Sequence, residues 1–144
     1  MTAAVVAALI AALSAIVVAG ATYWLTKQRE REAEWRKEKL EHYKAFVSAL
    51  SGTISGETTA EGQRAFARAC NNLNLIAPQR VIEALREFQE EIKISNPDKD
   101  QENHDRLIAA LFYEIRQDMG ISPRDNREKF RVGLWASGVR PDER

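Results

Sequence analysis

The pattern of the chain begins with an unbroken apolar run. Residues 2 to 26 carry no charged side chain, and nearly all of them are apolar. A helix needs about 20 apolar residues to cross the hydrocarbon core of a bilayer. The run is long enough for one transmembrane helix, so we expect a single-pass protein whose remaining residues form a soluble body.

A secretory signal peptide is the alternative interpretation of this run. Such a signal has a basic start, an apolar core of about 7–15 residues and a small-residue cleavage site. Ala19-Gly20-Ala21 would suit cleavage, but no Lys or Arg precedes the run and the run is longer than a signal core. Both departures favour a retained span.

Basic and aromatic residues mark one end of the span. Six basic residues follow it: Lys27, Arg29, Arg31, Arg36, Lys37 and Lys39. Because cytoplasmic flanks of spans are enriched in Lys and Arg, we expect the N-terminus outside and the body in the cytoplasm. Tyr23, Trp24, Lys27 and Arg29 are the expected anchors at the membrane interface.

Alanine recurs every four residues within the span. One row is Ala3, Ala7, Ala11, Ala15 and Ala19, and a second is Ala4, Ala8 and Ala12. Small residues at this spacing let two helix backbones approach closely in lipid. Either the span self-associates through Ala7, Ala11, Ala15 and Ala19, or alanine serves there only as an apolar residue.

The pattern becomes charged at residue 27 and then periodic at residue 40. Residues 27–41 are polar on nearly every helical face, which predicts a solvated stalk continuing the span. An apolar stripe with steps of three and four follows: Leu40, Tyr43, Val47, Leu50 and Ile54, with Phe46 beside it. Two heptads are too few to establish a coiled coil, so we expect this stripe to pack in a helical bundle.

A second and a third helix are predicted by periodicity and end signals. The second starts near Thr58, which would form a capping box with Glu61, and buries Phe66, Ala69, Cys70 and Leu73. The third has Pro78 in its first turn, where the missing N–H costs nothing. Its apolar stripe consists of Val81, Ile82, Leu85, Phe88 and Ile92.

The fourth helix is predicted over residues 103–119. Gly120 suits a left-handed stop there, and Ile121 would close a Schellman motif. The predicted fold is therefore all-α, with a transmembrane anchor (1–26), a charged helical stalk (27–41) and a small antiparallel helical bundle (42–121). A loosely ordered, flexible tail (122–144) follows, with one short helix near residues 126–135.

Composition and charge argue against several kinds of function. The chain of 144 residues has 21 Lys and Arg and 21 Asp and Glu, so its net charge is zero and we expect no nucleic-acid partner. His42 and His104 are the only histidines and lack ligand spacing, so no metal or other cofactor is expected. Cys70 is the only cysteine, so no intrachain disulfide can form, and it is expected to be a buried core residue.

Three groups of polar residues are candidates for chemistry. Glu83, Glu87, Glu90 and Glu91 cluster on the third helix, where we expect a solvated face rather than acid–base catalysis. Asn71, Asn72 and Asn74 near a helix end either cap the backbone or bind a partner. Arg116 suits a helix C-terminus and Asp118 does not, so Asp118 is expected to have a fixed partner in a fold-locking ion pair, with partner binding as the alternative.

Several short motifs support a family resemblance. They are Glu-Trp-Arg-Lys-Glu-Lys-Leu-Glu-His-Tyr (34–43), Asn-Asn-Leu-Asn-Leu-Ile-Ala-Pro (71–78), Val-Ile-Glu-Ala-Leu (81–85) and Ile-Arg-Gln-Asp-Met-Gly (115–120). The chain resembles a loose group of uncharacterised single-span bacterial and phage-encoded proteins with a small helical cytoplasmic domain. In them a helix ends in Ile-Arg-x-Asp-(Leu/Met)-Gly. The resemblance implies the architecture and no reaction.

These features together predict a membrane-anchored, non-enzymatic interaction protein. Its partners are expected to be the lipid bilayer and either a second copy of itself or an unidentified protein. The alternative is an oligomerising membrane-active effector, of the phage-defence or lysis type, that permeabilises the inner membrane. An enzyme is not expected, because no catalytic group of residues is evident in the sequence.

Overall fold

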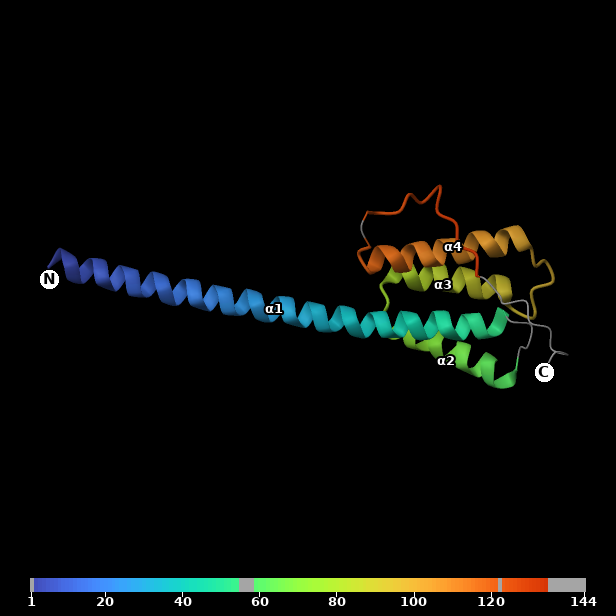
Figure 1. Cartoon of the computed structure of the whole chain (residues 1–144). Coiled ribbons are helices and arrows are strands. Elements are labelled where there is room, and N and C mark those ends of the chain that lie inside the picture. The colour runs from blue at the N-terminus through green and yellow to red at the C-terminus, as the bar shows by residue number, and fades with distance from the viewer. Residues whose placement is uncertain (1, 55–58, 122, 135–144) are drawn as a thin grey trace. The chain divides into compact units, whose positions relative to one another are not determined.

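The protein is all-helical over the residues that the structure, a computed structural model, describes: 2–54, 59–121 and 123–134. Four helices occur there, and they are α1 (Ala3–Ile54), α2 (Ala60–Ile76), α3 (Gln79–Ile92) and α4 (Gln101–Asp118) (Figure 1). The predicted all-α fold is confirmed. The chain divides into two compact units, Met1–Glu38 and Lys39–Arg144, and the boundary lies within α1.

The first unit contains the N-terminal part of α1. Every described residue from Thr2 to Glu38 is exposed, including Leu13 and Val17. Among the described residues, α1 is the one helix that is long and apolar enough to cross a membrane, by virtue of its stretch near the N-terminus. The length and composition of this helix therefore agree with a membrane anchor.

The second unit is an antiparallel bundle of four helical segments, formed by the end of α1 together with α2, α3 and α4 (Figure 1). Its largest fully buried side chains are Phe46, Phe88, Leu73, Leu85, Leu111, Val81 and Cys70. Tyr43, Phe46 and Leu50 of α1 are at most 3 % exposed. These residues thus face the core of their own chain, as predicted, and Val47 packs against it partly buried, whereas Leu40 of the predicted stripe is 37 % exposed. Lys39 already belongs to this unit.

Local signals set most helix ends in the bundle. The N-cap of α2 is Thr59, whose hydroxyl accepts a hydrogen bond from the Gly62 N–H at 3.0 Å. This agrees with the predicted start near Thr58, and Thr58 itself lies outside the described residues. The predicted capping box between Thr58 and Glu61 falls on an undescribed residue, and among the described contacts the Glu61 carboxylate pairs with Arg68 at 2.8 Å.

The end of α4 follows the prediction closely. Gly120 has φ of 67°, in the left-handed region that glycine adopts without steric cost. The Ile121 N–H bonds the Arg116 carbonyl at 3.2 Å, and the Gly120 N–H bonds the Gln117 carbonyl at 3.1 Å. These two bonds form the predicted Schellman motif.

The segment after α4 differs from the sequence prediction. Residues 126–134 form a turn followed by irregular chain, so the expected short helix is not present over the part that is described. Leu134 packs against the core of the bundle. Trp135 and the residues after it lie outside the described residues.

Candidate functional site

Asp118, at the end of α4, lies beside two side chains of α1 that are distant in sequence. Its carboxylate accepts a hydrogen bond from the Tyr43 hydroxyl at 2.6 Å and one from the Lys39 ammonium at 3.1 Å. The side chains of Lys39 and Asp118 are only 14 % and 13 % exposed. We call these three residues the Asp118 cluster. The expected fixed partner exists, and it is a lysine and a tyrosine of α1.

The environment of Tyr43 keeps its hydroxyl protonated. Burial raises the pKa of Tyr43 above its ordinary value, and the hydrogen bond to Asp118 raises it further. A neutral donor therefore faces Asp118 across the physiological range, alongside the positive charge of Lys39. The Asp118 cluster joins α1 to the C-terminal end of α4 through charge-assisted contacts, which are stronger than neutral ones.

Arg116 points to a different partner from Asp118. Its guanidinium donates two hydrogen bonds to Asp125, from Nε at 2.6 Å and from Nη2 at 3.1 Å. The hydrogen bond from Arg116 lowers the pKa of the Asp125 carboxyl, and the same bond raises the pKa of Arg116. We call residues 123–134, which Arg116 holds against α4, the strap.

A second ion pair between the strap and α4 has its arginine on the strap and its carboxylate on the helix. Arg127 of the strap lies 3.5 Å from the carboxylate of Glu114, which is buried on α4. The guanidinium of Arg127 also lies over the Tyr113 ring, and that of Arg116 lies over the Phe130 ring, each 5.6 Å from the centroid. Tyr113 and Phe130 meet edge to face at 5.8 Å. Aromatic pairs of this kind contribute about 0.5–1.5 kcal/mol beyond their buried area.

These contacts form one group, the Phe130 cluster. Its members are Tyr113, Glu114 and Arg116 on α4 and Asp125, Arg127 and Phe130 on the strap. A cleft of about 1000 Å³ opens beside it, between α4 and residues 127–133. Ala109 and Ala110 of α4 line the cleft together with Phe130 and Val132 of the strap. The strap therefore bridges part of α4 without filling the space beneath it.

The predicted asparagine group does not converge on a shared site. Asn71 and Asn72 are exposed on α2. The Asn74 side chain donates to the Cys70 carbonyl one turn earlier, at 3.3 Å. Asn74 thus bonds the backbone of its own helix, and partner binding by this group stays a prediction.

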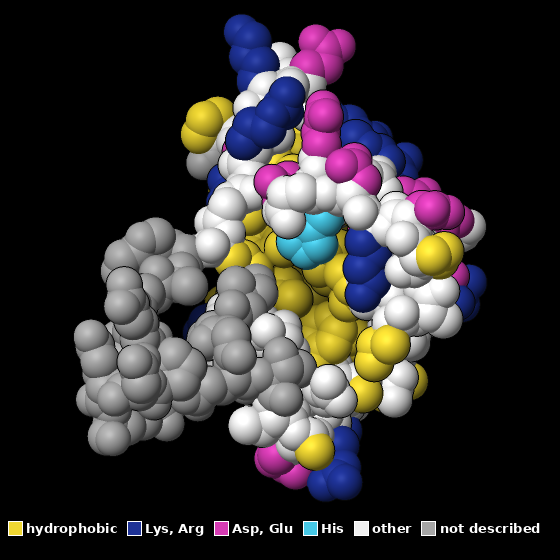
Figure 2. Space-filling model, turned by 90° about the vertical axis from the view of Figure 1, so that its right-hand side faces the viewer, with side chains coloured by type: hydrophobic (Ala, Val, Ile, Leu, Met, Phe, Trp, Pro, Cys, Tyr) yellow, Lys and Arg dark blue, Asp and Glu magenta, His cyan; other side chains and the backbone are white. Residues whose placement is uncertain are grey.

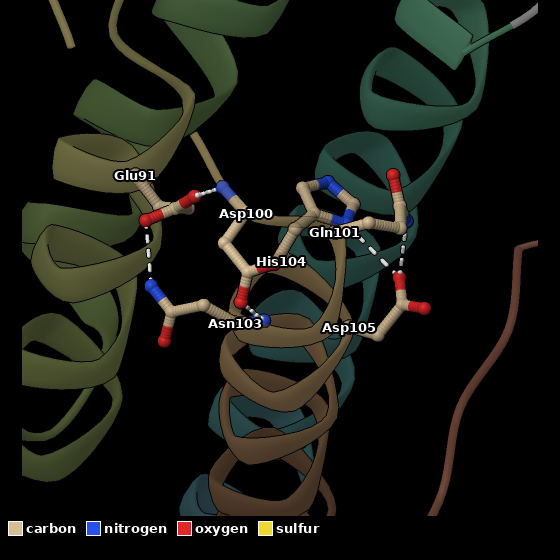
Figure 3. A network of polar contacts seen from close by, with 6 residues as sticks. All are labelled: Glu91, Asp100, Gln101, Asn103, His104 and Asp105. Atoms are coloured by element: carbon tan, nitrogen blue, oxygen red, sulfur yellow. Dashed lines mark hydrogen bonds and ion pairs between the residues drawn. The ribbon is translucent and has the colours of Figure 1, made fainter. Parts of the chain in front are cut away.

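Glu91 departs from the predicted solvated face of α3. It is 8 % exposed, whereas Glu83, Glu87 and Glu90 are exposed as expected. Its carboxylate accepts the Asp100 N–H at 2.9 Å and the Asn103 side-chain amide at 2.6 Å (Figure 3). Glu91 therefore fixes the start of α4 against the end of α3, and the prediction for this residue was wrong.

The reason for that error is visible in the spacing. Glu91 follows Phe88 by three residues, just as Glu114 follows Leu111 by three residues on α4. Both glutamates therefore occupy positions of the buried helical face. If helical spacing had been given more weight than the charge of glutamate, both residues would have been predicted as buried carboxylates that need hydrogen-bond partners.

His104 and Cys70 have structural surroundings. Figure 2 shows the end of the bundle at which α2 and α4 begin, where hydrophobic side chains line a hollow beside a histidine. The His104 ring lies 5.4 Å from the Phe88 ring, and its Nδ1 is 3.2 Å from Asp105. Burial raises the pKa of the Cys70 thiol, which disfavours the reactive thiolate.

The polar groups of the bundle are occupied by one another. Among the described residues, no buried side-chain nitrogen or oxygen lacks a hydrogen-bond partner. No group of three or more His, Cys, Asp or Glu residues in the described part could hold a metal ion. The arrangement is one of structural hydrogen bonds and ion pairs between helices.

The remaining predicted residues lie on the first unit. Ala7, Ala11, Ala15 and Ala19 are exposed along α1, as are Tyr23, Trp24, Lys27 and Arg29. The Lys27 ammonium pairs with Glu30 at 2.8 Å along the helix. These positions leave the alanine row available to another helix and do not test whether one binds there.

Comparison with known proteins yields no match. No family model, curated protein or solved structure matches the chain.

Proposed function

We propose that this protein is a membrane-anchored, non-enzymatic interaction protein whose cytoplasmic helical body binds a partner protein or a second copy of itself. The exposure of the apolar part of α1 carries the proposal. Ile10, Leu13, Ile16 and Val17 are each at least 60 % exposed. Burying one such side chain is worth about 1.5–3 kcal/mol relative to leaving it in water. A helix exposed in this way is stable in lipid.

Charge placement supports the orientation. The six basic residues that follow the apolar run favour a cytoplasmic position for the bundle and an external one for the start of α1. Tyr23 and Trp24 suit the headgroup region at the cytoplasmic side. The resemblance to single-span bacterial and phage-encoded proteins supports the bacterial inner membrane as the site.

The contacts inside the bundle support a non-enzymatic body. Three carboxylates are paired with partners within the chain, and they belong to Asp118, Glu91 and Glu114. The apolar stripe of α1 is covered by the other helices. Recognition by this body would therefore use its surface.

Site-directed labelling tests the anchor and its orientation. Thr2→Cys and Asn126→Cys place one accessible thiol in each unit, and the parent chain reports the background from buried Cys70. A membrane-impermeant maleimide should label Thr2→Cys in intact cells and Asn126→Cys only after lysis. Release of the full chain from membranes by carbonate washing would refute the anchor, and the reverse labelling would refute the orientation.

Cross-linking in intact membranes tests the interaction itself. Recovery of the chain joined to a specific protein or to a differently tagged copy is the expected result. A chain that is recovered only as a monomer, after cross-linking at native expression and without any associated protein, would contradict the proposal.

The alternative function is an oligomerising effector that permeabilises the inner membrane. The exposed alanine row of α1 favours it, because small residues allow spans to pack closely in lipid. Ala11→Leu combined with Ala15→Leu should abolish dye uptake by cells that overexpress the protein. Val6→Leu with Val17→Leu is the matched control on the opposite face. Normal membrane potential on overexpression of the unaltered chain would exclude this function.

A further inference from the structure

The strap is a separable element of the bundle. Over residues 123–134 it has no helix or strand, and it meets α4 mainly through side chains. Arg124, Asn126, Arg127, Glu128, Lys129 and Arg131 are exposed. The cleft of about 1000 Å³ between the strap and α4 means that much of its length lacks tight packing. Segments with few buried contacts open at a lower free energy than the core does.

Removing the strap would leave α4 intact. The Schellman bonds at Gly120 and Ile121 close the helix before the strap begins. The core helices pack on one another through Leu107, Ile108, Leu111 and Ile115, all of which belong to the main cluster. The contact of Leu134 with the core is lost when the strap leaves, but the helix-to-helix contacts at the centre of the bundle stay in place.

The surface beneath the strap has a specific charge requirement. It presents a carboxylate, Glu114, and a guanidinium, Arg116, two residues apart on α4. The strap supplies the opposite charge to each of them through Arg127 and Asp125. A simple acidic or basic segment would satisfy one of these groups and repel the other. An aromatic ring is also needed against Tyr113, and Phe130 supplies it.

We propose that the strap exchanges between copies: residues 123–134 of one copy dock on α4 of a second copy and rebuild the Phe130 cluster in both directions. The inference rests on the self-association version of the proposed function. A second copy is the occupant because its strap carries the required acid, base and ring at the required spacing. Exchange of an identical element gives a symmetric dimer with no new interface chemistry. Anchoring in one membrane would favour it by raising the effective concentration.

Cross-linking between tagged copies tests the exchange. One full-length copy carries Tyr113→Cys and the other, with a different tag, carries Phe130→Cys, and both are expressed in the same membrane. A short bismaleimide should join the two tags. Ala67→Cys with Glu83→Cys, on exposed positions of α2 and α3, is the control pair for collisions or for association through the span alone. Equal yields from the two pairs would overturn the proposal.

A charge exchange gives a second, independent test. Glu114→Arg in one copy and Arg127→Glu in the other each place like charges together within a copy. Only exchange between the two different copies restores opposite charges. Strap protection from proteolysis should be lost in each variant alone and recovered on co-expression. Failure to recover, with both variants folded by circular dichroism, would overturn the exchange.

The two proposals fail in distinguishable ways. Strap exchange alone is refuted if the chain resists carbonate washing and cross-links to another protein, but the two tags are never joined through positions 113 and 130. A double variant, Tyr113→Cys with Phe130→Cys, that yields only product within one copy does the same. Release of the chain from membranes by carbonate refutes the membrane anchor and therefore also the proposed function.

Discussion

The two parts of α1 share one helical backbone and follow opposite rules of burial. From Ala3 to Thr26 the side chains are nearly all apolar and all exposed, whereas from Lys39 onward the apolar residues recur with helical spacing and the recurring positions are buried. Uniform apolarity suits a surrounding that is the same on every side, such as lipid. Periodic apolarity suits a helix that meets protein on one side and water on the other.

The comparison also separates the two candidate faces for self-association. The stripe of Tyr43, Phe46 and Leu50 has the spacing of a coiled-coil seam, yet it is covered by α2, α3 and α4. The alanine row of the first part remains exposed. Helix association through α1 is therefore expected from the span and not from the heptad stripe.

The largest expected effect comes from placing charge in the first part. Leu13→Arg with Val17→Arg should release the protein from membranes, because one arginine near the centre of a span costs about 2.5–3.5 kcal/mol on the insertion scale. The bundle, which begins at Lys39, should keep its thermal unfolding temperature. Flotation on a density gradient and circular dichroism measure the two properties. A bundle that unfolds along with the loss of membrane binding would contradict the separation.

The converse change addresses the second part. Phe46 is fully buried, and Phe46→Ala should cost about 3–5 kcal/mol of folding stability. This is a large share of the roughly 5–15 kcal/mol that holds a typical domain together. Leu9→Ala, on the exposed part of α1, is the control and should leave the unfolding temperature unchanged. Equal effects of the two changes in denaturation curves would refute the comparison.

A smaller effect is expected at the Asp118 cluster, where α1 meets α4. Tyr43→Phe removes a 2.6 Å hydrogen bond to a carboxylate and should cost about 1.5–3 kcal/mol. Burial and Asp118 raise the pKa of Tyr43, so its contribution to stability is present below the unfolded pKa of about 10 and is lost as pH rises toward the folded value.

Denaturation at high pH measures this contribution. The unaltered chain should lose stability as pH rises above about 10, and Tyr43→Phe should lose less over the same interval. Parallel curves for the two proteins would show that Tyr43 does not titrate with folding.

The smallest effect concerns the strap. Arg116 lowers the pKa of Asp125, so the contribution of this pair is present above the unfolded pKa of about 4 and is lost as pH falls through the folded value. We expect the Tyr113–Phe130 contact to weaken in acid, and Asp125→Asn to weaken it at every pH. Nuclear Overhauser effects between the two rings measure the contact. A contact in Asp125→Asn as strong as in the unaltered chain at neutral pH would contradict this role.

Much of the architecture followed from the amino-acid sequence alone. The helical period identified four helices, and the apolar run identified the candidate span within α1. The stop at Gly120 was predicted from a glycine followed by an apolar residue. These features depend on side chains within a few positions of one another, so local rules of spacing and backbone geometry are sufficient.

The candidate sites depended on contacts between distant segments. Asp118 was predicted to have a fixed partner, but Lys39 lies 79 residues away in the chain and no local rule selects it. The docking of residues 123–134 was missed because its determinants, Asp125 and Phe130, are ordinary tail residues until Arg116 and Tyr113 are placed beside them. The helical spacing of Glu91 and Glu114 indicated burial, but their charge favoured a prediction of exposure.

The sequence by itself determined the four helices, the stop of α4 and the stretch that is apolar on all sides, because the helical repeat and the left-handed conformation of glycine act over a few residues; the short helix expected near residues 126–135 was wrong over the described part. Only the tertiary structure decided that the stripe of α1 faces its own bundle, that Asp118 meets α1 and that the strap returns to α4. Those outcomes depend on which surfaces are complementary in shape and charge once the helices are packed.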